Sequence, residues 1–324
     1  TSGTDNAWLS APEMQAVWML LSAAFFAGMG VCVKFASQHF NASELVFYRG
    51  VISVVIMLAM LRGRDIEWRT QMPGQHLWRS AVGVFSLVTW FYALAELPLA
   101  TAMTLNYMSS VWVALMALIA TLWWRLRGSG VRPALAQNGR QAWPLGLSIL
   151  ASFIGVVLML RPTVDNSQWF AAGVGLVSGL VAALAYLQVR TLTHAGEPIT
   201  RTVLFFSIAT MLTGAAGMGL QGVSPWNAQA AWWLLPLGVL SSAGQMCMTR
   251  GYSHGPTLVA ANLHYAGIVF GALFSVAFFD DPITWWTWAG MAVILLSGIW
   301  ATWLQESPPQ TLCGELNAHP PHQR

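Results

Sequence analysis

Two polar side chains, Asn106 and His264, stand inside long apolar stretches of the chain. A carboxamide and an imidazole surrounded by apolar side chains can hydrogen-bond a small polar molecule, and an imidazole can also titrate near neutral pH. The alternative is that each side chain bonds a neighbouring helix and serves packing alone. Because a polar group is expensive inside hydrocarbon, both residues are candidates for a binding site.

The two apolar stretches that hold these side chains resemble each other. One begins at Pro98 and the other at Pro256, and when the prolines are aligned the asparagine falls on the histidine. The next position is tyrosine in both copies, Tyr107 and Tyr265. A chain that contains the same segment twice indicates a duplicated protein. We therefore expect the two tyrosines to cap one site from the two halves.

Further polar and aromatic residues are candidates for the wall of the same cavity. Ser110 lies four residues after Asn106, so both occupy one face of a helix. Other apolar runs contribute Trp90, Tyr186 and Gln188. Aromatic and amide groups suit a small neutral or zwitterionic metabolite, such as an amino acid or a related compound.

Charged residues near the ends of the apolar runs form a second candidate group. Arg49 lies one turn inside a run, where a guanidinium group either snorkels outward or pairs with an acid. Lys34, Glu44 and Glu96 fall at the same outer edge, so we expect a structural or gating ion-pair cluster that closes the outside. Anion binding is the alternative role for Arg49. Arg250 is a candidate for the cytoplasmic edge, with positive-inside anchoring as its alternative.

Several kinds of chemistry are missing from the apolar runs. All 12 acidic residues lie in loops, tails or ends of runs, which disfavours the carboxylate relay of proton-coupled cationic-drug export. His264 has no second histidine or acid at the spacing of a zinc motif such as HExxH, and the three cysteines show no CxxC spacing. We therefore expect no metal site, no cofactor, no nucleic-acid partner and no intramembrane enzyme.

The composition predicts the surroundings of these residues. The chain is 56% hydrophobic and 8% charged, whereas soluble domains carry roughly 25% charged residues. The predicted fold class is an all-α polytopic membrane protein with ten transmembrane helices, embedded in the lipid bilayer. The predicted spans are Ala16–Phe35, Glu44–Leu61, Leu77–Leu97, Thr101–Trp124, Trp143–Leu160, Phe170–Arg190, Thr202–Leu220, Ala230–Arg250, Thr257–Phe279 and Thr284–Leu304.

The basic residues predict how the spans are oriented. Arginines gather in the loops after the second and fourth spans, among them Arg62, Arg64 and Arg125, and Arg79 sits at a span end on the same side. Because cytoplasmic loops carry the excess of Lys and Arg, this asymmetry places both termini in the cytoplasm. We expect a multi-pass protein of the cell (inner) membrane, as a monomer or a homodimer.

The ten spans divide into two repeats of five. Because five is odd, the second repeat must be inverted relative to the first. The predicted organisation is an N-terminal cytoplasmic segment at 1–15, a first five-helix repeat at 16–160, a second at 170–304 and a disordered cytoplasmic tail at 305–324. The basic segment Arg125–Gln141 is expected to be a flexible linker between the fourth and fifth spans.

Several short motifs lie at the ends and corners of the spans, and Val33-Lys34 is matched by Val189-Arg190 in the second half. The motifs are Val33-Lys34, Phe47-Tyr48-Arg49-Gly50, Phe91-Tyr92-Ala93-Leu94, Leu97-Pro98-Leu99-Ala100 and Arg250-Gly251-Tyr252-Ser253-His254-Gly255-Pro256. Together they resemble the drug/metabolite transporter (DMT) superfamily, in its EamA-type branch, over residues 16–304.

This resemblance implies ten helices in two inverted repeats around a central cavity, lined mainly by spans one, three, four, six, eight and nine. It also implies alternating-access transport of small metabolites. Family members often place an acidic residue after the fourth and ninth spans. Here Asp280-Asp281 follows the ninth span, but Trp124-Arg125 follows the fourth.

The expected function is secondary transport, without ATP, of a small metabolite through a central cavity. Export of a drug or toxic compound is the alternative, and an intramembrane enzyme is the remaining one. The residues do not define the substrate, the direction of transport or coupling to an ion.

Overall fold

The computed structural model describes residues 11–127, 168–253, 260, 263–280 and 284–305, with isolated positions between 144 and 158. The regular secondary structure of these residues is helical, with no strand among them. The helices are α1 (Ala11–Ala36), α2 (Ala42–Arg62), α3 (Pro73–Glu96), α4 (Leu99–Tyr107), α5 (Ser109–Arg127), α7 (Trp169–His194), α8 (Ile199–Gln221), α9 (Ala228–Ala231), α10 (Leu234–Ser253), α12 (Ala266–Phe279) and α13 (Trp285–Gln305).

The lengths and composition of the helices fit a membrane. Among the described helices, α1, α2, α3, α7 and α8 are long and apolar enough to cross one, and α12 and most of α13 are shorter apolar helices. With α4, α5 and α10 they account for every predicted span except the fifth, Trp143–Leu160, most of which lies outside the described residues. The predicted fold class is confirmed. Residues 128–141 and 306–324 also lie outside the description.

Several hydroxyl side chains inside the spans are satisfied by their own helices. Thr104, Ser207, Thr210 and Thr249 each donate to the carbonyl four residues earlier, at 2.7–2.8 Å. These bonds let a polar side chain lie within an apolar helix without leaving an unpaired donor.

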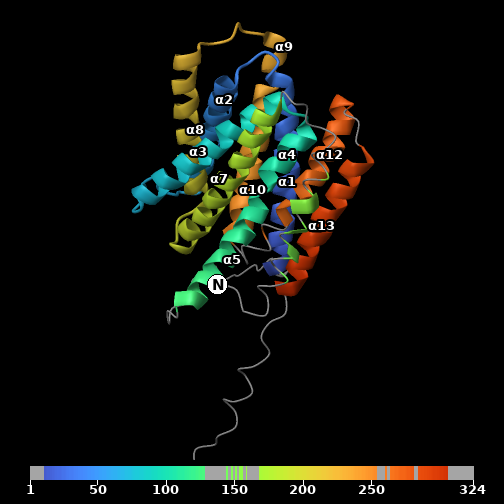
Figure 1. The fold of residues 1–324 in the computed structure, drawn as a ribbon. Coiled ribbons are helices and arrows are strands. Elements are labelled where there is room, and N and C mark those ends of the chain that lie inside the picture. The colour runs from blue at the N-terminus through green and yellow to red at the C-terminus, as the bar shows by residue number, and fades with distance from the viewer. Residues whose placement is uncertain are drawn as a thin grey trace, which may run out of the picture.

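The packing of the helices follows the relation expected between inverted repeats. α1 packs against α10, and the equivalent helices α7 and α3 pack against each other. Likewise α1 contacts α12 while α7 contacts α4, and α2 contacts α10 while α8 contacts α3. Exchanging the two halves therefore maps one set of contacts onto the other. Figure 1 shows α2 and α8 together at one edge of the bundle, with α12 and α13 at the opposite edge.

Glycines bring α2 and α8, which are equivalent helices, into close contact. A Cβ atom on Gly50 would lie 2.5 Å from the backbone nitrogen of Met211, and one on Gly214 would overlap the backbone of Phe47. The two glycines therefore stand in reciprocal places across this antiparallel pair. Small residues at such contacts let membrane helices approach backbone to backbone.

The fourth and ninth spans are both interrupted. The fourth breaks at Met108, between α4 and α5, and a turn at Tyr265 precedes α12 in the ninth. When Tyr107 is aligned with Tyr265, the two interruptions fall at adjacent positions. The sequence predicts both spans as continuous helices, but each is interrupted beside its polar residue, Asn106 or His264.

Candidate functional site

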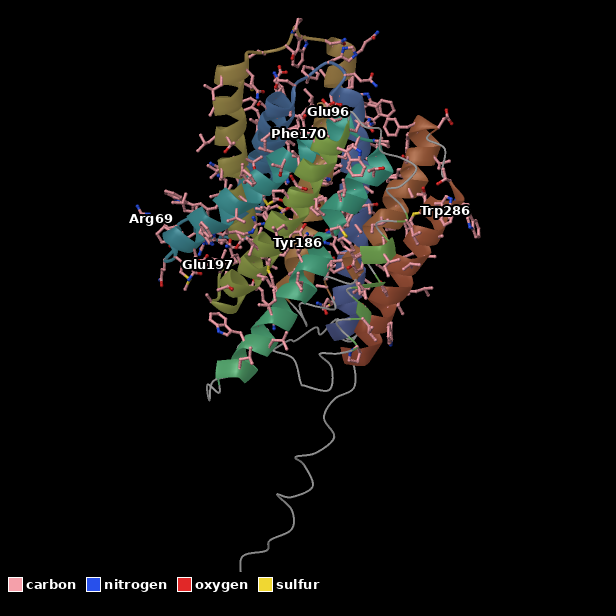
Figure 2. All side chains as sticks on the ribbon, viewed as in Figure 1. Arg69, Glu96, Phe170, Tyr186, Glu197 and Trp286 are labelled. Atoms are coloured by element: carbon pink, nitrogen blue, oxygen red, sulfur yellow. The ribbon has the colours of Figure 1, made fainter. Side chains whose placement is uncertain are left out.

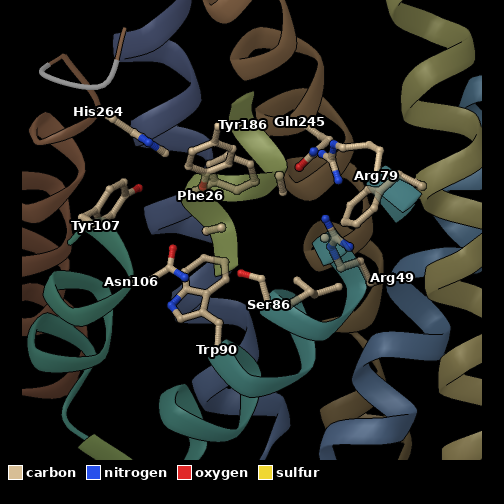
Figure 3. Close-up of a pocket in the computed structure, with 15 residues that line it drawn as sticks. Phe26, Arg49, Arg79, Ser86, Trp90, Asn106, Tyr107, Tyr186, Gln245 and His264 are labelled. Carbon is tan, nitrogen blue, oxygen red and sulfur yellow. The ribbon is translucent and has the colours of Figure 1, made fainter. Parts of the chain in front are cut away.

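A cavity lies at the centre of the bundle, between the two halves (Figure 3). Its wall comes from α1, α2, α3, α4, α7, α8 and α10, and from the turn that precedes α12. The contributions of α2 and α8 go beyond the spans that the resemblance implied. The wall consists of Phe26, Arg49, Arg79, Gly83, Ser86, Leu87, Trp90, Asn106, Tyr107, Ala182, Ala185, Tyr186, Phe206, Gln245 and His264.

At one end of the cavity the His264 ring is enclosed by tyrosines. Its centroid lies 4.6 Å from the Tyr107 ring, which it meets edge-on, 5.4 Å from Tyr186 and 6.5 Å from Tyr252. The side chains come from both halves of the chain, and such edge-on contacts favour a fixed ring orientation. Among the described residues, no set of three or more His, Cys, Asp or Glu side chains is grouped to hold a metal ion.

Asn106 both lines the cavity and bonds a neighbouring helix. Its Nδ2 donates to Ser178 Oγ at 3.1 Å, and Ser178 Oγ donates to the carbonyl of Gly175 at 2.6 Å. Ser86 of α3 donates to the carbonyl of Ser178 at 2.8 Å. Ser178 therefore links α3, α4 and α7 and fixes the orientation of the Asn106 carboxamide.

Several polar atoms of the cavity wall lack a hydrogen-bond partner among the described residues. They are Nε1 of Trp90, the hydroxyl oxygen of Tyr107 and both ring nitrogens of His264. Buried polar groups in proteins are nearly always hydrogen-bonded, so orphaned atoms in a cavity wall are candidates for contact with a bound molecule.

At the other end of the cavity two guanidinium groups approach one aromatic ring. Cζ of Arg49 lies 5.3 Å, and Cζ of Arg79 4.7 Å, from the centroid of the Phe206 ring. Figure 3 shows both arginines on the side of the cavity away from His264 and Tyr107. The cavity therefore has a cationic end and an aromatic end.

The structure brings together five of the predicted binding residues. Those in the cavity wall are His264, Asn106, Tyr107, Trp90 and Tyr186. Gln188 is outside the wall because two residues turn a helix by about 200°, which directs it away from Tyr186. Ser110 and Tyr265 are buried but do not line the cavity either, and Tyr265 instead forms the turn before α12.

The predicted outer ion-pair cluster is not assembled around Arg49. This residue lies about two turns inside α2, rather than one, and reaches the cavity. Lys34 Nζ donates to the carbonyl of Leu97 at 2.5 Å, while the Glu96 side chain is exposed near Phe170 at one end of the bundle (Figure 2). In the described part of the chain, no acidic side chain forms an ion pair with Arg49.

Arg250 lies near the end of α10, away from the cavity wall. Its Cζ is 4.8 Å from the centroid of the Trp18 ring on α1. A cation–π contact of this kind joins the two helices at their shared end.

The wall residues that sequence reasoning missed include Arg79, Phe206 and Gln245. Arg79 was assigned to a cytoplasmic span end because the third span is predicted to begin at Leu77. The helix instead begins at Pro73, so Arg79 lies almost two turns inside it. Proline is favoured in the first turn of a helix, and this signal could have placed the arginine in the interior.

A hydrogen-bonded network joins the α2–α3 connection to the α7–α8 connection, and we call it the Glu197 latch. Glu197 accepts from Thr70 Oγ1 and, at 2.8 Å, from Arg201 Nη1, and its carboxylate lies 3.4 Å from His76 Nε2. Arg201 also donates twice to the carbonyl of Glu67, at 3.0 and 2.7 Å. Burial raises the pKa of the Glu197 carboxyl, but hydrogen bonds from Thr70 and Arg201 outweigh it and hold this pKa below its usual value.

A second network, the Glu44 latch, lies at the other end of the α2–α8 pair. Glu44 accepts from the backbone nitrogen and hydroxyl of Ser224, at 3.0 and 2.6 Å. It also accepts from the backbone nitrogen of Asn41 at 2.7 Å, which completes a capping box at the start of α2. Asn41 Nδ2 donates to the carbonyl of Gly222 at 3.2 Å. Each latch thus joins connections from the two halves.

Comparison with known proteins gives matches along most of the chain. Residues 14–124 and 169–303 match the model of the EamA-like transporter family. The pseudopaline exporter CntI of Pseudomonas aeruginosa is 29% identical over 280 residues, covering 86% of this chain and 93% of that protein. A riboflavin transporter of Rhizobium johnstonii is 24% identical over 287 residues, covering 88% and 89%. A crystal structure that is 16% identical shares the fold with a TM-score of 0.63, covering 91% of this chain and 98% of that one.

Proposed function

The chain belongs to the EamA-like transporter family, and on that premise we propose that it carries a small metabolite across the membrane by alternating access, without ATP. The observation that carries the proposal is the position of the cavity. It lies beside the interruptions of two equivalent spans, and its polar wall includes Asn106 and Tyr107 from one half and His264 from the other. Transporters built from inverted repeats bind substrate at the interface between the repeats, near the middle of the membrane.

The wall supports a small polar substrate. A carboxamide at Asn106, an indole N–H at Trp90 and the imidazole of His264 offer hydrogen bonds between aromatic surfaces. An amino acid or a related neutral or zwitterionic compound suits these groups. Two relatives, a pseudopaline exporter and a riboflavin transporter, support a small-molecule cargo without fixing which one.

Export of a drug or toxic compound is the alternative, and the aromatic end of the cavity favours it. A cationic drug would meet Arg49 and Arg79 at the other end, and the described residues of the wall include no acid to pair with it. We propose no catalytic step, because the described neighbours of His264 are aromatic rings rather than a nucleophile or an acid.

We further propose that both termini are cytoplasmic and that the protein lies in the cell (inner) membrane. The arginine distribution supports this orientation. It agrees with the Glu197 latch, which joins two connections that this topology puts on the inside, and with the Glu44 latch, which joins two on the outside.

The test is flux into proteoliposomes that contain the purified full chain. A panel of amino acids and related metabolites would be offered to wild type, to Asn106→Ala and to Trp285→Ala, a control whose side chain is 78% exposed at the start of α13. We expect at least one compound to enter with wild type and the control, and its entry to fall about tenfold in Asn106→Ala, since a lost hydrogen bond is worth about 1 kcal/mol or more. Absence of entry for every compound would contradict the proposal.

A further inference from the structure

The structure assigns Arg49 and Arg79 to one oxyanion-binding site at the cationic end of the cavity, and we propose that the transported molecule carries a carboxylate or phosphate group there. This inference rests on the proposed function, because it names a chemical class for the substrate of the same cavity. It takes up anion binding, the alternative role for Arg49, and specifies a negatively charged group on the substrate.

The first support is that both guanidinium groups are buried and close together. Arg49 and Arg79 are 3% and 2% exposed, and each approaches the ring of Phe206. Their Cζ atoms are therefore no farther apart than the sum of their two distances from that ring. Both side chains also line the same end of the cavity, so one end of a molecule bound there faces both guanidinium groups.

The second support is that neither arginine is paired within the described part of the chain. The salt bridges there involve Glu197 with His76 and with Arg201, and the hydrogen bonds include none from Arg49 or Arg79. Nε of both arginines and Nη1 of Arg79 are buried without a partner. Among the described residues, no aspartate or glutamate lines the cavity.

The two buried positive charges indicate that the ligand is negatively charged. Arginine stays protonated in proteins, so the site holds two positive charges in a region of low dielectric. Such charges are costly unless an opposite charge and hydrogen bonds accompany them. The contact with Phe206 offsets only part of this cost. An anion supplied by the transported molecule would provide the missing charge.

The geometry of arginine favours an oxyanion. The planar guanidinium group presents paired N–H donors that match two oxygens of a carboxylate or phosphate. A halide ion could neutralise the charge but has no pair of oxygens to receive both donors of a fork. The amide and aromatic groups at the other end of the cavity, Asn106, Trp90 and His264, remain free to contact the rest of the molecule.

The test is the thermal stability of the purified full chain in a neutral detergent and a low-salt Tris–chloride buffer. Millimolar succinate, citrate and glycerol 3-phosphate would be compared with succinamide, which is uncharged, and with sodium chloride at matched ionic strength. We expect at least one oxyanion to raise the apparent Tm by about 3 °C or more, because a ligand of the native state stabilises it. A response to succinate or citrate assigns a carboxylate, and a response to glycerol 3-phosphate alone assigns a phosphate.

The variants decide whether the arginines are responsible. The oxyanion-induced shift should disappear in Arg49→Gln and in Arg79→Gln, and persist in Arg62→Gln, an exposed arginine on the same helix as Arg49. If a Gln variant does not fold, Arg79→Lys takes its place. It keeps the positive charge but loses the fork, so at least half of the shift should be lost. Equal shifts in wild type and the cavity variants, or no oxyanion shift in wild type, would overturn the site.

Proteoliposome flux with the same variants separates this inference from the proposed function. Suppose that entry of an uncharged metabolite is lost in Asn106→Ala but unchanged in Arg79→Gln. That result would contradict the oxyanion site and still support the transport proposal. Arginine-dependent stabilisation by an oxyanion, without entry of any compound, would support the site and contradict the transport proposal.

Discussion

Glu44 and Glu197 lie at opposite ends of the α2–α8 pair, and each accepts a hydrogen bond from a hydroxyl that belongs to the other half of the chain. The donor is Ser224 for Glu44 and Thr70 for Glu197. Each carboxylate lies near the start of its helix, where a negative charge is favoured. The two latches therefore lie at opposite faces of the bundle.

Release of one latch should open one face. The reporter is Ala182→Cys in the cavity wall, in a chain whose native cysteines Cys32, Cys247 and Cys313 are replaced by serine. Loss of a hydrogen bond to a charged group costs about 1.5–3 kcal/mol, so the open population should rise about tenfold or more. We expect a membrane-impermeant maleimide to label the reporter faster from the Ser224 side in Glu44→Gln.

The second latch variant is the matched control for the first. In Glu197→Gln, faster labelling should come from the opposite face, the one that holds Thr70. Equal acceleration from both faces in both variants would show that the latches serve general stability rather than gating.

Acid should weaken the Glu197 latch. The pKa of this carboxyl is lower in the folded protein than in the unfolded chain, so its contribution to stability is present above the usual glutamate pKa of about 4.3 and is lost as the pH falls through the folded value. The apparent Tm of wild type should therefore drop on acidification below that pH more steeply than that of Glu197→Gln. Parallel curves for the two proteins would contradict this assignment.

Close packing at the first span interruption predicts a sharp difference between two glycines of α7. A Cβ atom on Gly179 would lie 2.7 Å from the carbonyl oxygen of Leu105, whereas one on Gly173 would meet nothing within 4 Å. Gly179→Ala should destabilise the protein by about 1–3 kcal/mol, as overpacking does. Gly173→Ala should leave it unchanged or slightly more stable. Denaturation in detergent measures both, and equal effects would refute close packing at this break.

The difference between Asn106 and His264 should affect which substrate is preferred. The two positions are equivalent in the repeats, and His264→Asn makes them identical in chemistry. Because the imidazole contacts three tyrosine rings and has unpaired nitrogens, we expect the variant to change the apparent substrate affinity by about tenfold, the effect of one hydrogen bond. Competition assays in proteoliposomes measure this change, and an unaltered ranking of substrates would argue for packing alone.

The fold was largely predictable because its signals are long and repeated. Apolar runs of membrane-spanning length predict the helices, and the alignment of Pro98 with Pro256 predicts that Asn106 and His264 approach one cavity. Both do line it. The interruptions at Met108 and Tyr265 were not predictable, because neither position carries the glycine or proline that usually marks a break.

The cationic end was the part of the site that sequence reasoning misplaced. An arginine near the end of an apolar run fits three roles equally well: anchoring, pairing or binding. Which role applies depends on where the helix begins, and a difference of one helical turn is enough to change it. Arg79 shows this, since a helix start at Pro73 rather than Leu77 moves it from the membrane edge to the cavity. Pairing between Arg79 and Phe206 depends on contact between α3 and α8, which no local pattern predicts.

The central claim is that a small metabolite passes through the cavity between the two halves, with its negative group held by the arginines. The most direct measurement is entry of radiolabelled carboxylate metabolites into proteoliposomes containing wild type, Arg79→Gln or Trp285→Ala. The account predicts entry with wild type and with Trp285→Ala, and a loss of about tenfold or more in Arg79→Gln. Entry that is equal in all three proteins, or absent from all three, would contradict it.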